Sequence, residues 1–435
     1  MSIWRLHERI SKKKLMWSIA GAVALTLVAT LLVLNLSSGE KKIQHRVERL
    51  YSVEDPQFMH VMGVLLGPPV VGGNRYEVLL NGDRIFPPML EAIRGAQRTI
   101  DFETYIYWSE AIGKAFADAL AERARAGVKV HVLLDWIGSQ KMEQAYVDEM
   151  KAAGIEVLKY HPPHWSHLGR LNNRTHRKLL IVDGRIGFTG GVGIAQQWTG
   201  DAQDPDHWRD THFKVEGPVV AQMQSVFMDN WIKSTGRILH GAEYFPALAP
   251  VGEGRAQMFS SSPSGGSESM ELMYLLSITA ASRTIRLSSS YFVPNDLAVE
   301  AMTAALRRGV RLQIITPGRH TDAETVRSAS KETWGRLLAA GAEIYEYQPT
   351  MYHCKVMIVD EFLVSTGSTN FDNRSFRLND EANLNIYDTA FAKQQVEVFE
   401  ADLKRSRRIT LAEWQRRPLT ERLAEKAAAL IGSQL

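Results

Sequence analysis

The stretch YHCKVMIVD at residues 352–360 has a near copy upstream, THRKLLIVD at residues 175–183. Both read histidine, any residue, lysine, four mostly apolar residues and aspartate. A short run of apolar and β-branched residues is typical of a buried strand, on which side chains two positions apart share a face. We therefore expect His176 to point the same way as Lys178. The second copy predicts the same for His353 and Lys355.

Two imidazoles and two ammonium groups in one site suit the chemistry of a phosphodiester. The lysines neutralise the phosphate, one imidazole attacks phosphorus, and the other protonates the leaving oxygen. A lone histidine on an apolar strand is more simply a core residue, but the duplication argues for a functional site. Cys354, the single cysteine, excludes an intramolecular disulfide. It lies on the opposite face of its strand, where we expect it to pack in the core.

A turn rich in small residues follows each copy: FTGGVG at residues 188–193 and STGSTN at residues 365–370. Small residues allow backbone N–H groups to approach a phosphate closely. We expect three residues of these turns to contact the substrate: Gly191, Ser368 and Asn370.

The duplicated motif resembles the mark of the phospholipase D superfamily, and longer runs resemble its cardiolipin synthase-like members. These runs are NRTHRK at residues 173–178, WRDTH at 208–212 and GSTNFDNRSF at 367–376. The likeness covers most of the chain from about Tyr76 onward. The family pattern often carries asparagine in both halves. Because Gly193 stands where the second half has Asn370, one phosphate contact is expected to be missing or supplied elsewhere.

A nucleophilic imidazole needs an acceptor on its far nitrogen, which fixes the tautomer and stabilises the charged ring. The resemblance implies that Asp210 and Glu381, each near the start of a later strand, orient the histidines. A surface ion pair is the alternative for these two residues. Asp183 and Asp360 complete the two catalytic motifs, and we expect them to be structural because they lie at strand ends.

The composition is that of an ordinary globular protein. The chain has 435 residues, of which 45% are hydrophobic and 23% charged. The length allows about two to four domains. A formal net charge of +3 is too small to indicate nucleic-acid binding by itself.

Residues 15–36 are almost wholly apolar, carry no charge and are long enough to span a membrane as a helix. A signal peptide has a shorter apolar region and a small-x-small cleavage site, for which residues 35–38 are a poor match. We expect an uncleaved single-pass anchor in a bacterial plasma membrane. Basic residues precede it in segment 1–14, which favours a cytoplasmic N-terminus and a catalytic domain on the outer face. Basic residues also follow it closely, so the bias is small.

The chain after the anchor predicts a linker, two similar halves and a tail. In the linker, residues 37–75, an apolar piece at residues 61–66 either lies on the membrane or docks on the domain. From Tyr76 the order of strand, helix and two strands occurs twice, which indicates an α/β fold with sheets covered on both faces. We expect two phospholipase D-like α/β/α halves, residues 76–248 and 249–400, related by a pseudo-twofold axis with the site between them. The tail, residues 401–435, reads as a basic helix that is solvated or adsorbed to anionic lipid.

Within these halves the pattern predicts specific elements. In the first half, strands are expected at residues 99–108, at 127–134 and after 152–155, with a helix at about 111–126. In the second half, strands are expected to open at residue 284 and to occupy 309–315 and 339–344, with a helix at about 297–308.

Two further stretches leave alternatives open. The sequence HPPHWSH at residues 161–167 either binds zinc or forms a rim loop that places Trp165 at a lipid interface. Its prolines break the helix that would align the histidines, which favours the rim loop. The insertion at residues 199–207, together with Gln197 and Trp198, is expected to shape the mouth of the site.

The resemblance implies a membrane-anchored phosphatidyltransferase that moves a phosphatidyl group between phosphatidylglycerol molecules through a phosphohistidine. It implies His176 as the nucleophile and His353 as the acid and then the base. No cofactor and no metal is expected, because the lysines supply the charge that a metal supplies elsewhere. The alternative is a phosphodiesterase that hydrolyses phospholipid or nucleic acid, and a non-catalytic lipid-binding protein is a third possibility. The anchor and the small net charge argue against nucleic acid.

Overall fold

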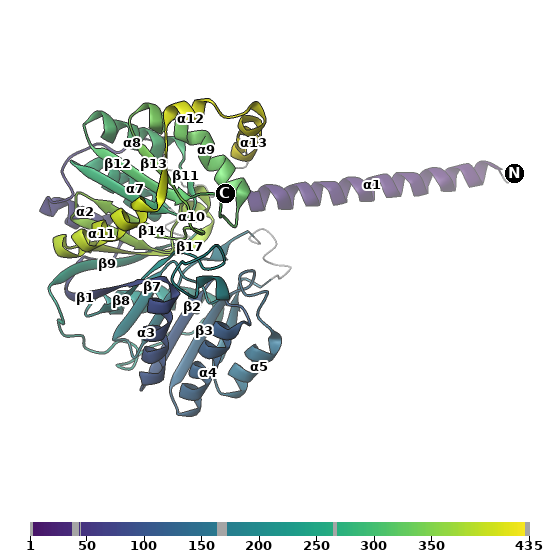
Figure 1. Ribbon diagram of the computed structural model, residues 1–435. Coiled ribbons are helices and arrows are strands. Elements are labelled where there is room, and N and C mark those ends of the chain that lie inside the picture. The colour runs from purple at the N-terminus through teal and green to yellow at the C-terminus, as the bar shows by residue number, and fades with distance from the viewer. Residues whose placement is uncertain (1–2, 37–42, 44, 163–171, 264–267, 431–435) are drawn as a thin grey trace.

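The computed structural model describes residues 3–36, 43, 45–162, 172–263 and 268–430. Within these ranges two similar α/β halves share one continuous sheet path (Figure 1). The halves meet where β1 (Val71–Leu80) pairs antiparallel with β9 (Gly254–Ser261). Outward from that seam the two halves repeat the same order of strands, so the expected α/β fold with two similar halves is confirmed.

In the first half the sheet order from the seam is β1-β8-β7-β6-β2-β3-β4. The elements after β1 are α3 (Asn81–Gly95), β2 (Thr99–Thr104), α4 (Ala111–Arg125), β3 (Lys129–Asp135), α5 (Gln144–Ala152), β4 (Glu156–Tyr160), β5 (Arg174–Thr175), β6 (Leu179–Val182), β7 (Ile186–Gly190), β8 (Thr211–Glu216) and α6 (Val220–Thr235). A short 3-10 helix, Gln196–Trp198, precedes β8.

In the second half the order is β9-β17-β15-β14-β10-β12-β13-β18. The elements after β9 are α7 (Glu268–Ala280), β10 (Thr284–Ser289), β11 (Phe292–Val293), α8 (Asp296–Arg307), β12 (Arg311–Pro317), α9 (Glu324–Ala339), β13 (Glu343–Tyr347), β14 (Lys355–Val359), β15 (Leu363–Gly367), β16 (Phe371–Asp372), α10 (Asn373–Arg377), β17 (Asn379–Tyr387) and α11 (Thr389–Lys404).

Helix ends follow local chemistry. The side chain of Asn295 accepts the backbone N–H of Ala298, which caps the start of α8. Gly309, with φ at 92°, follows the end of the same helix in a conformation that favours glycine. The amphipathic pattern predicted for residues 297–308 therefore has clear start and stop signals.

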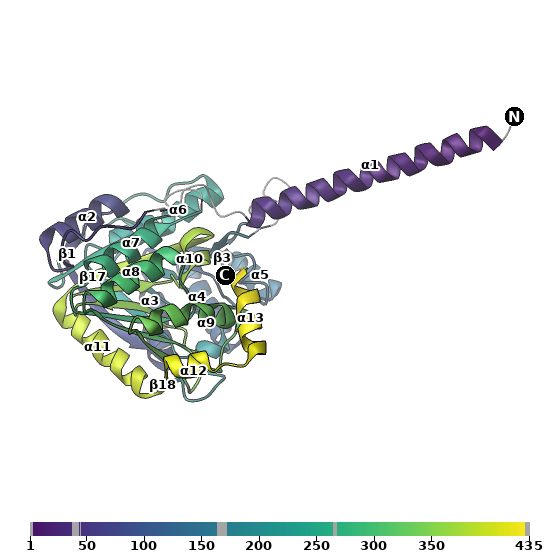
Figure 2. The ribbon, with the colours of Figure 1, turned by 90° about the horizontal axis from the view of Figure 1, so that it is seen from above.

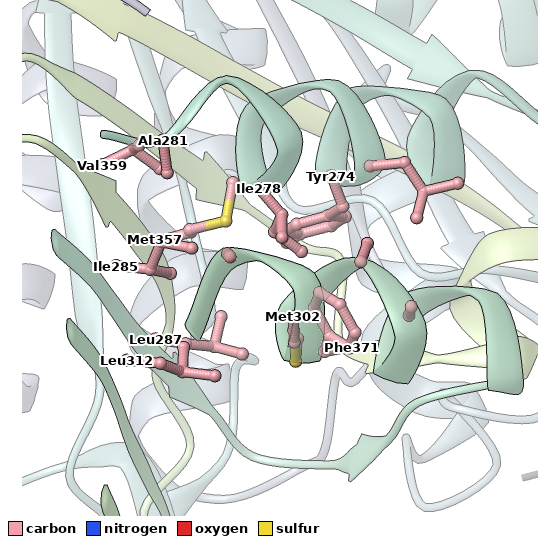
Figure 3. Close-up of a cluster of buried hydrophobic side chains, with 14 of the residues drawn as sticks. Tyr274, Ile278, Ala281, Ile285, Leu287, Met302, Leu312, Met357, Val359 and Phe371 are labelled. Carbon is pink, nitrogen blue, oxygen red and sulfur yellow. The ribbon is translucent and has the colours of Figure 1, made fainter. Parts of the chain in front are cut away.

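The hydrophobic core is divided between the outer faces and the seam. Helices α7 and α8 cover one face of the sheet in the second half, where Ile278, Leu287 and Met357 pack together (Figure 3). A separate cluster joins residues of both halves, among them Phe213 and Phe227 of the first and Leu384 of the second. This shared core fixes the two halves against each other and thereby positions whatever lies between them.

The N-terminal helix α1 (Ile3–Leu36) extends away from the globular body (Figures 1 and 2). Its segment Lys12–Leu34 is long and apolar enough to cross a membrane, and none of it is buried in the protein. The helix begins before the predicted apolar segment at residue 15 because the basic N-terminal residues continue the same helix.

The segment expected to be a linker contains ordered structure. Its apolar piece forms the end of α2 (Pro56–Leu66), which begins at an Asp55 cap and buries Phe58, Met62 and Leu66 in the second-half core. Strand β1 begins at Val71, ahead of the expected start at Tyr76. Of the two alternatives for this piece, docking on the domain is the one observed.

The tail is not wholly helical. Strand β18 (Ser406–Ile409) pairs antiparallel with β13 before the helices α12 (Leu411–Gln415) and α13 (Leu419–Leu430). Arg407 stands opposite Glu346 on the neighbouring strand and forms an ion pair of 2.8 Å with it. The basic composition of the tail predicts a helix, but β18 forms a strand because Arg407 pairs with a carboxylate far away in the sequence.

Candidate active site

Each motif histidine is tied by its backbone to the opposite half. The N–H of His176 donates to the carbonyl of Asp380 at 2.9 Å, and the N–H of His353 donates to the carbonyl of Arg209 at 2.8 Å. The adjoining strands begin only at Leu179 and Lys355, so the prediction that both histidines lie within those strands is wrong. The reason is that the backbone N–H of each histidine bonds to a carbonyl of the other half and not to a neighbouring strand of its own half.

Two carboxylates hold the imidazoles, again across the seam. Nδ1 of His176 lies 3.0 Å from Oε1 and 3.1 Å from Oε2 of Glu381. Nδ1 of His353 lies 2.7 Å from Oδ2 of Asp210. An ionised carboxylate accepts a proton from Nδ1–H, which leaves Nε2 of each ring for chemistry.

These carboxylates are themselves held in place. Ser368 donates from Oγ to Oε2 of Glu381 at 2.5 Å, and the amide nitrogen of Asn379 donates to Oε1 at 3.2 Å. The indole N–H of Trp198 donates to Asp210 at 3.0 Å. Ser368 does not line the cavity, so its expected contact with substrate is replaced by support of Glu381.

The lysines point toward the histidines, as the two-residue spacing predicts. Nζ of Lys178 donates to the carbonyl of His176 at 2.8 Å. Nζ of Lys355 lies 3.2 Å and 3.3 Å from the two ring nitrogens of His353 and donates to Ser290 at 2.7 Å. Ser290 in turn donates to the amide oxygen of Asn370 at 2.9 Å, which directs the amide group of this cavity residue. Ser290 lies outside both motifs, and no pattern in the sequence predicts its role.

Gly191 has a different role from the one predicted. It does not line the cavity, and its N–H donates to the carbonyl of Thr211 at 3.2 Å. A Cβ at this position would come within 2.1 Å of the carboxylate of Asp210. Gly191 therefore leaves room for Asp210, and the expectation of a direct phosphate contact is wrong.

Gly193, the counterpart of Asn370, is also confined by packing. A Cβ at position 193 would approach Ile106 to 2.7 Å and the ring of Trp198 to 3.1 Å. The space that an asparagine side chain would need is filled by these two residues, both of which line the cavity. The first half therefore has glycine where the second has Asn370 because Trp198 and Ile106 leave no room for a side chain.

The motif aspartates are anchors for the backbone. Asp183 accepts the N–H groups of residues 97–99, at 2.7–3.2 Å. Asp360 accepts those of residues 282–284, at 2.7–2.8 Å. Each aspartate thereby fixes the start of a neighbouring strand, β2 or β10, and neither lines the cavity.

Cys354 is buried with its thiol turned away from the histidines. Its Sγ lies 3.5 Å from Oγ1 of Thr211, and it does not line the cavity. Burial raises the pKa of this thiol to about 12. The thiol is therefore a packing group, as strand alternation predicts.

A cavity of about 520 Å³ lies between the halves and exposes the site. The rings of Trp198 and Trp208 lie 5.2 Å and 5.4 Å from that of His353. The cavity is lined by Tyr105, Ile106, Trp108, Arg174, His176, Lys178, Gln197, Trp198, Trp208, Tyr291, Asp322, Val326, His353, Asn370, Asp372, Arg374 and Asn379. Gln197 and Trp198 thus lie at the site as expected, whereas the insertion between Trp198 and Trp208 does not line it.

Sequence reasoning missed several of these residues, notably Tyr105, Tyr291, Arg174 and Arg374. The two arginines do stand within the runs that carry the family resemblance. Tyr105 directly follows strand β2, and Tyr291 stands two residues after the end of β10. Of the proposed zinc or rim stretch, His164, Trp165 and His167 lie outside the described residues. Within the described ranges, no three His, Cys, Asp or Glu side chains gather as a metal site.

The electrostatics of the site suit a bound anion. Burial, opposed by Glu381 and aided by Lys178, lowers the pKa of His176 to about 4. Burial and the charge of Lys355 lower the pKa of Lys178 to about 7. Burial also lowers the pKa values of His353 and Lys355. A negative charge in the cavity would raise all four pKa values, so the site gains protons and cationic charge as an anion binds.

The carboxylates remain ionised. Burial by itself raises the pKa of Glu381, but His176, Lys178 and the bond from Ser368 together lower it below its usual value. The same balance, with His353 and Lys355, lowers the pKa of Asp210. Both groups therefore act as acceptors for Nδ1–H.

Comparison with known proteins agrees with this geometry. The family model described as "Cardiolipin synthase, PLD-like domain" matches residues 89–231 and 274–403. A cardiolipin synthase of Geobacillus kaustophilus is 34% identical over 370 residues, covering 84% of this chain and 74% of the relative. One from Geobacillus sp. WCH70 is 36% identical with the same coverage.

The crystal structure of a phosphatidylserine synthase from Haemophilus influenzae superposes with a TM-score of 0.64. It covers 87% of this chain and all of its own, and at 14% identity it supports the fold alone. With both halves matched by the family model and the two motifs meeting in one cavity, the chain belongs to the phospholipase D-like cardiolipin synthase family and is a phosphatidyltransferase of that type.

Proposed function

We propose that the protein transfers a phosphatidyl group from one phosphatidylglycerol to a hydroxyl of a second and releases glycerol. The observation that supports this most strongly is the pair of imidazoles on one cavity, each held at Nδ1 by a carboxylate of the opposite half. The name of the relatives, cardiolipin synthase, supports the identity of the product.

In the first step Nε2 of His176 attacks the donor phosphorus. The bond from Nε2 to phosphorus forms as the bond from phosphorus to the glycerol oxygen breaks. Glu381 accepts Nδ1–H throughout and stabilises the positive ring. Nε2–H of His353 gives its proton to the departing glycerol oxygen, which leaves as an alcohol.

In the second step the acceptor lipid takes the place of glycerol. Nε2 of His353, now without its proton, takes the proton of the acceptor hydroxyl. The hydroxyl oxygen bonds to phosphorus as the bond to His176 breaks. The protonated His353 is thereby restored, and Asp210 stabilises this charged form.

The lysines and Asn370 hold the phosphate oxygens. Lys178 and Lys355 approach the two histidines from opposite halves, so a phosphate between the rings meets an ammonium group on each side. The phosphate charge raises the lowered pKa of His353, which makes this residue a competent acid only when substrate is bound.

The apolar helix supports a single-pass anchor in the bacterial plasma membrane, which brings the site to its lipid substrates. Basic residues before the apolar segment support a cytoplasmic N-terminus and a catalytic domain on the outer face.

The proposal is tested by incubating the purified full-length protein with phosphatidylglycerol in detergent micelles and identifying the products by mass spectrometry. Cardiolipin and glycerol in equal amounts are expected. Phosphatidic acid without cardiolipin would mean that water is the acceptor and that the protein is a hydrolase. Cleavage of single-stranded DNA at a comparable rate would indicate a nuclease instead.

A further inference from the structure

We propose that Arg174 and Arg374 form a second anion subsite in the cavity, which binds the phosphate of the acceptor lipid. The inference rests on the proposed function, because a transfer between two phosphatidylglycerol molecules brings a second phosphate into the site. The first phosphate is held between His176 and His353. The second belongs to the acceptor and is joined to its attacking hydroxyl by a three-carbon glycerol.

The two arginines reach the cavity from opposite halves. Arg174 lies on β5, two residues before His176, and Arg374 lies in α10, four residues after Asn370. Both are half-buried and line the cavity. Nη1 of Arg174 donates to the carbonyl of Asn173 at 2.8 Å, and Nη2 of Arg374 donates to the carbonyl and side-chain oxygens of Asn172 at 3.0 Å. Hydrogen bonds to the chain before the first motif thus hold both guanidinium groups at the wall.

The charges of the two groups repel each other. Burial lowers the pKa of Arg174, the charge of Arg374 acts in the same direction, and the carboxylate of Asp135 opposes both. Two like charges in a partly buried wall raise the energy of the empty site. A phosphate between them would relieve the repulsion, and the planar guanidinium group matches phosphate oxygens in pairs.

Tyr105 adjoins both the reacting centre and the charges of the two arginines. Its ring centre lies 5.2 Å from that of His176, and Nζ of Lys178 lies 5.6 Å from the same ring centre. Burial raises the pKa of its hydroxyl, whereas the charges of Arg174 and Arg374 act in the opposite direction. The ring therefore adjoins the nucleophile while the hydroxyl is within electrostatic range of both arginines. Arg174 also stands two residues before His176, so the subsite adjoins the reacting centre, as an acceptor whose phosphate lies one glycerol from its attacking oxygen requires.

Two carboxylates also line the cavity, and each has a partner. Asp322 accepts the hydroxyl of Tyr291 at 2.7 Å. Asp372 accepts the backbone N–H of Ser375 at 2.7 Å, and burial raises its pKa to about 6. A phosphate bound nearby would raise this pKa further, so Asp372 takes up a proton more readily than an exposed carboxylate does.

The test compares two acceptors that use the same donor. The full-length protein is given phosphatidylglycerol in mixed micelles, and cardiolipin formation is measured together with exchange of labelled glycerol into the donor lipid. Exchange uses an acceptor without a phosphate. The variants are Arg174→Gln and Arg374→Gln, each paired with its Lys counterpart. The control is Arg75→Gln, which removes an exposed arginine paired with Glu216 on β1.

Each Gln variant is expected to lower cardiolipin formation relative to glycerol exchange by about tenfold or more, because a charge-assisted contact to the acceptor phosphate is lost. The effect should appear as a raised KM for phosphatidylglycerol as acceptor, and the Lys variants should recover part of the ratio. The Arg75→Gln control should keep the wild-type ratio. An equal fall of both activities, or no change in the ratio, would overturn the subsite.

The outcomes separate this inference from the proposed function. A wild-type protein that forms neither cardiolipin nor exchanged lipid contradicts the proposed function, whatever the arginines do. Inorganic phosphate identifies the source of the anion. In one outcome, inorganic phosphate inhibits cardiolipin formation more than glycerol exchange in the wild type, and the Gln variants lack this difference. The subsite then also takes free phosphate. In the other outcome, inorganic phosphate inhibits neither activity, while the Gln variants still lower the ratio of cardiolipin formation to glycerol exchange. The subsite then takes phosphate only as part of a lipid headgroup.

Discussion

His176 of the first half is held by Glu381 of the second, with Nδ1 3.0 Å from Oε1 across a separation of 205 residues. The converse contact joins His353 of the second half to Asp210 of the first at 2.7 Å. Neither half by itself therefore contains both a motif histidine and the carboxylate that orients it. The shared core at the seam is what assembles the site.

The crossed contacts predict which step each carboxylate serves. Glu381→Gln removes the charge beside His176 and should slow phosphorylation of the protein about 100-fold. Asp210→Asn should leave that step nearly intact and slow transfer to the acceptor instead. The two steps are separated with a p-nitrophenyl phosphodiester, whose leaving group needs no proton. Glu253→Gln, an exposed carboxylate on the loop before β9, is the matched control. Slowing of the burst by Asp210→Asn but not by Glu381→Gln would show that His353, the partner of Asp210, is the nucleophile.

The pH profile should report Lys178. Its pKa is lowered to about 7 by burial and Lys355, so the free enzyme loses this charge as the pH rises through about 7. His176, the proposed nucleophile, has a pKa of about 4 and is therefore neutral at pH 7. For the p-nitrophenyl donor, kcat/KM should therefore be limited by protonation of His176 only near pH 4 and should decline above about pH 7. Lys178→Arg should lower the maximum and abolish the alkaline decline. A wild-type profile that is flat between pH 6 and 9 would mean that Lys178 keeps its charge.

Removal of divalent metal should leave the enzyme active. Lys178 and Lys355 lie beside the two histidines in opposite halves. In the proposed mechanism they supply the charge that a metal supplies in other phosphoryl-transfer enzymes. Cardiolipin formation is measured after dialysis against excess EDTA, with Mg²⁺ added back as the control. Complete loss that Mg²⁺ restores would contradict this account of the charge.

The N-terminal helix should behave as an integral anchor. Segment Lys12–Leu34 is apolar and exposes its side chains along its whole length. The full-length protein should stay with membranes through an alkaline carbonate wash, and deletion of residues 1–36 should release much of it. Release of the full-length protein by carbonate would indicate surface adsorption.

Local rules explain what the sequence predicts well. The period of two along an extended chain places Lys355 beside His353, and turns Cys354 away, although the histidine stands just before the strand. Alternating strands and amphipathic helices predict the α/β class and the repeat. These inferences need only neighbours along the chain.

The failures concern contacts that depend on how separate strands pack against one another. Gly191 resembles a phosphate-binding glycine, yet the missing side chain makes room for Asp210. Ser368 resembles a ligand for substrate, yet its hydroxyl holds Glu381. In both cases the partner is a carboxylate whose position depends on how the strands pack, which the spacing of the motifs does not encode. The strand β18 escaped prediction for the same reason, because its partner Glu346 lies on distant β13.

In the proposed mechanism His176 carries the bond to phosphorus and His353 moves the protons. The most direct measurement is peptide mapping of the protein after a p-nitrophenyl phosphodiester burst, in the His353→Ala and His176→Ala variants. His353→Ala should release one equivalent of nitrophenol and accumulate a phosphoramidate on His176, because no base remains to activate the acceptor. His176→Ala should give neither burst nor adduct. An adduct on His353 that forms only in His176→Ala would reverse the roles, and the absence of an adduct from both variants would contradict the covalent mechanism.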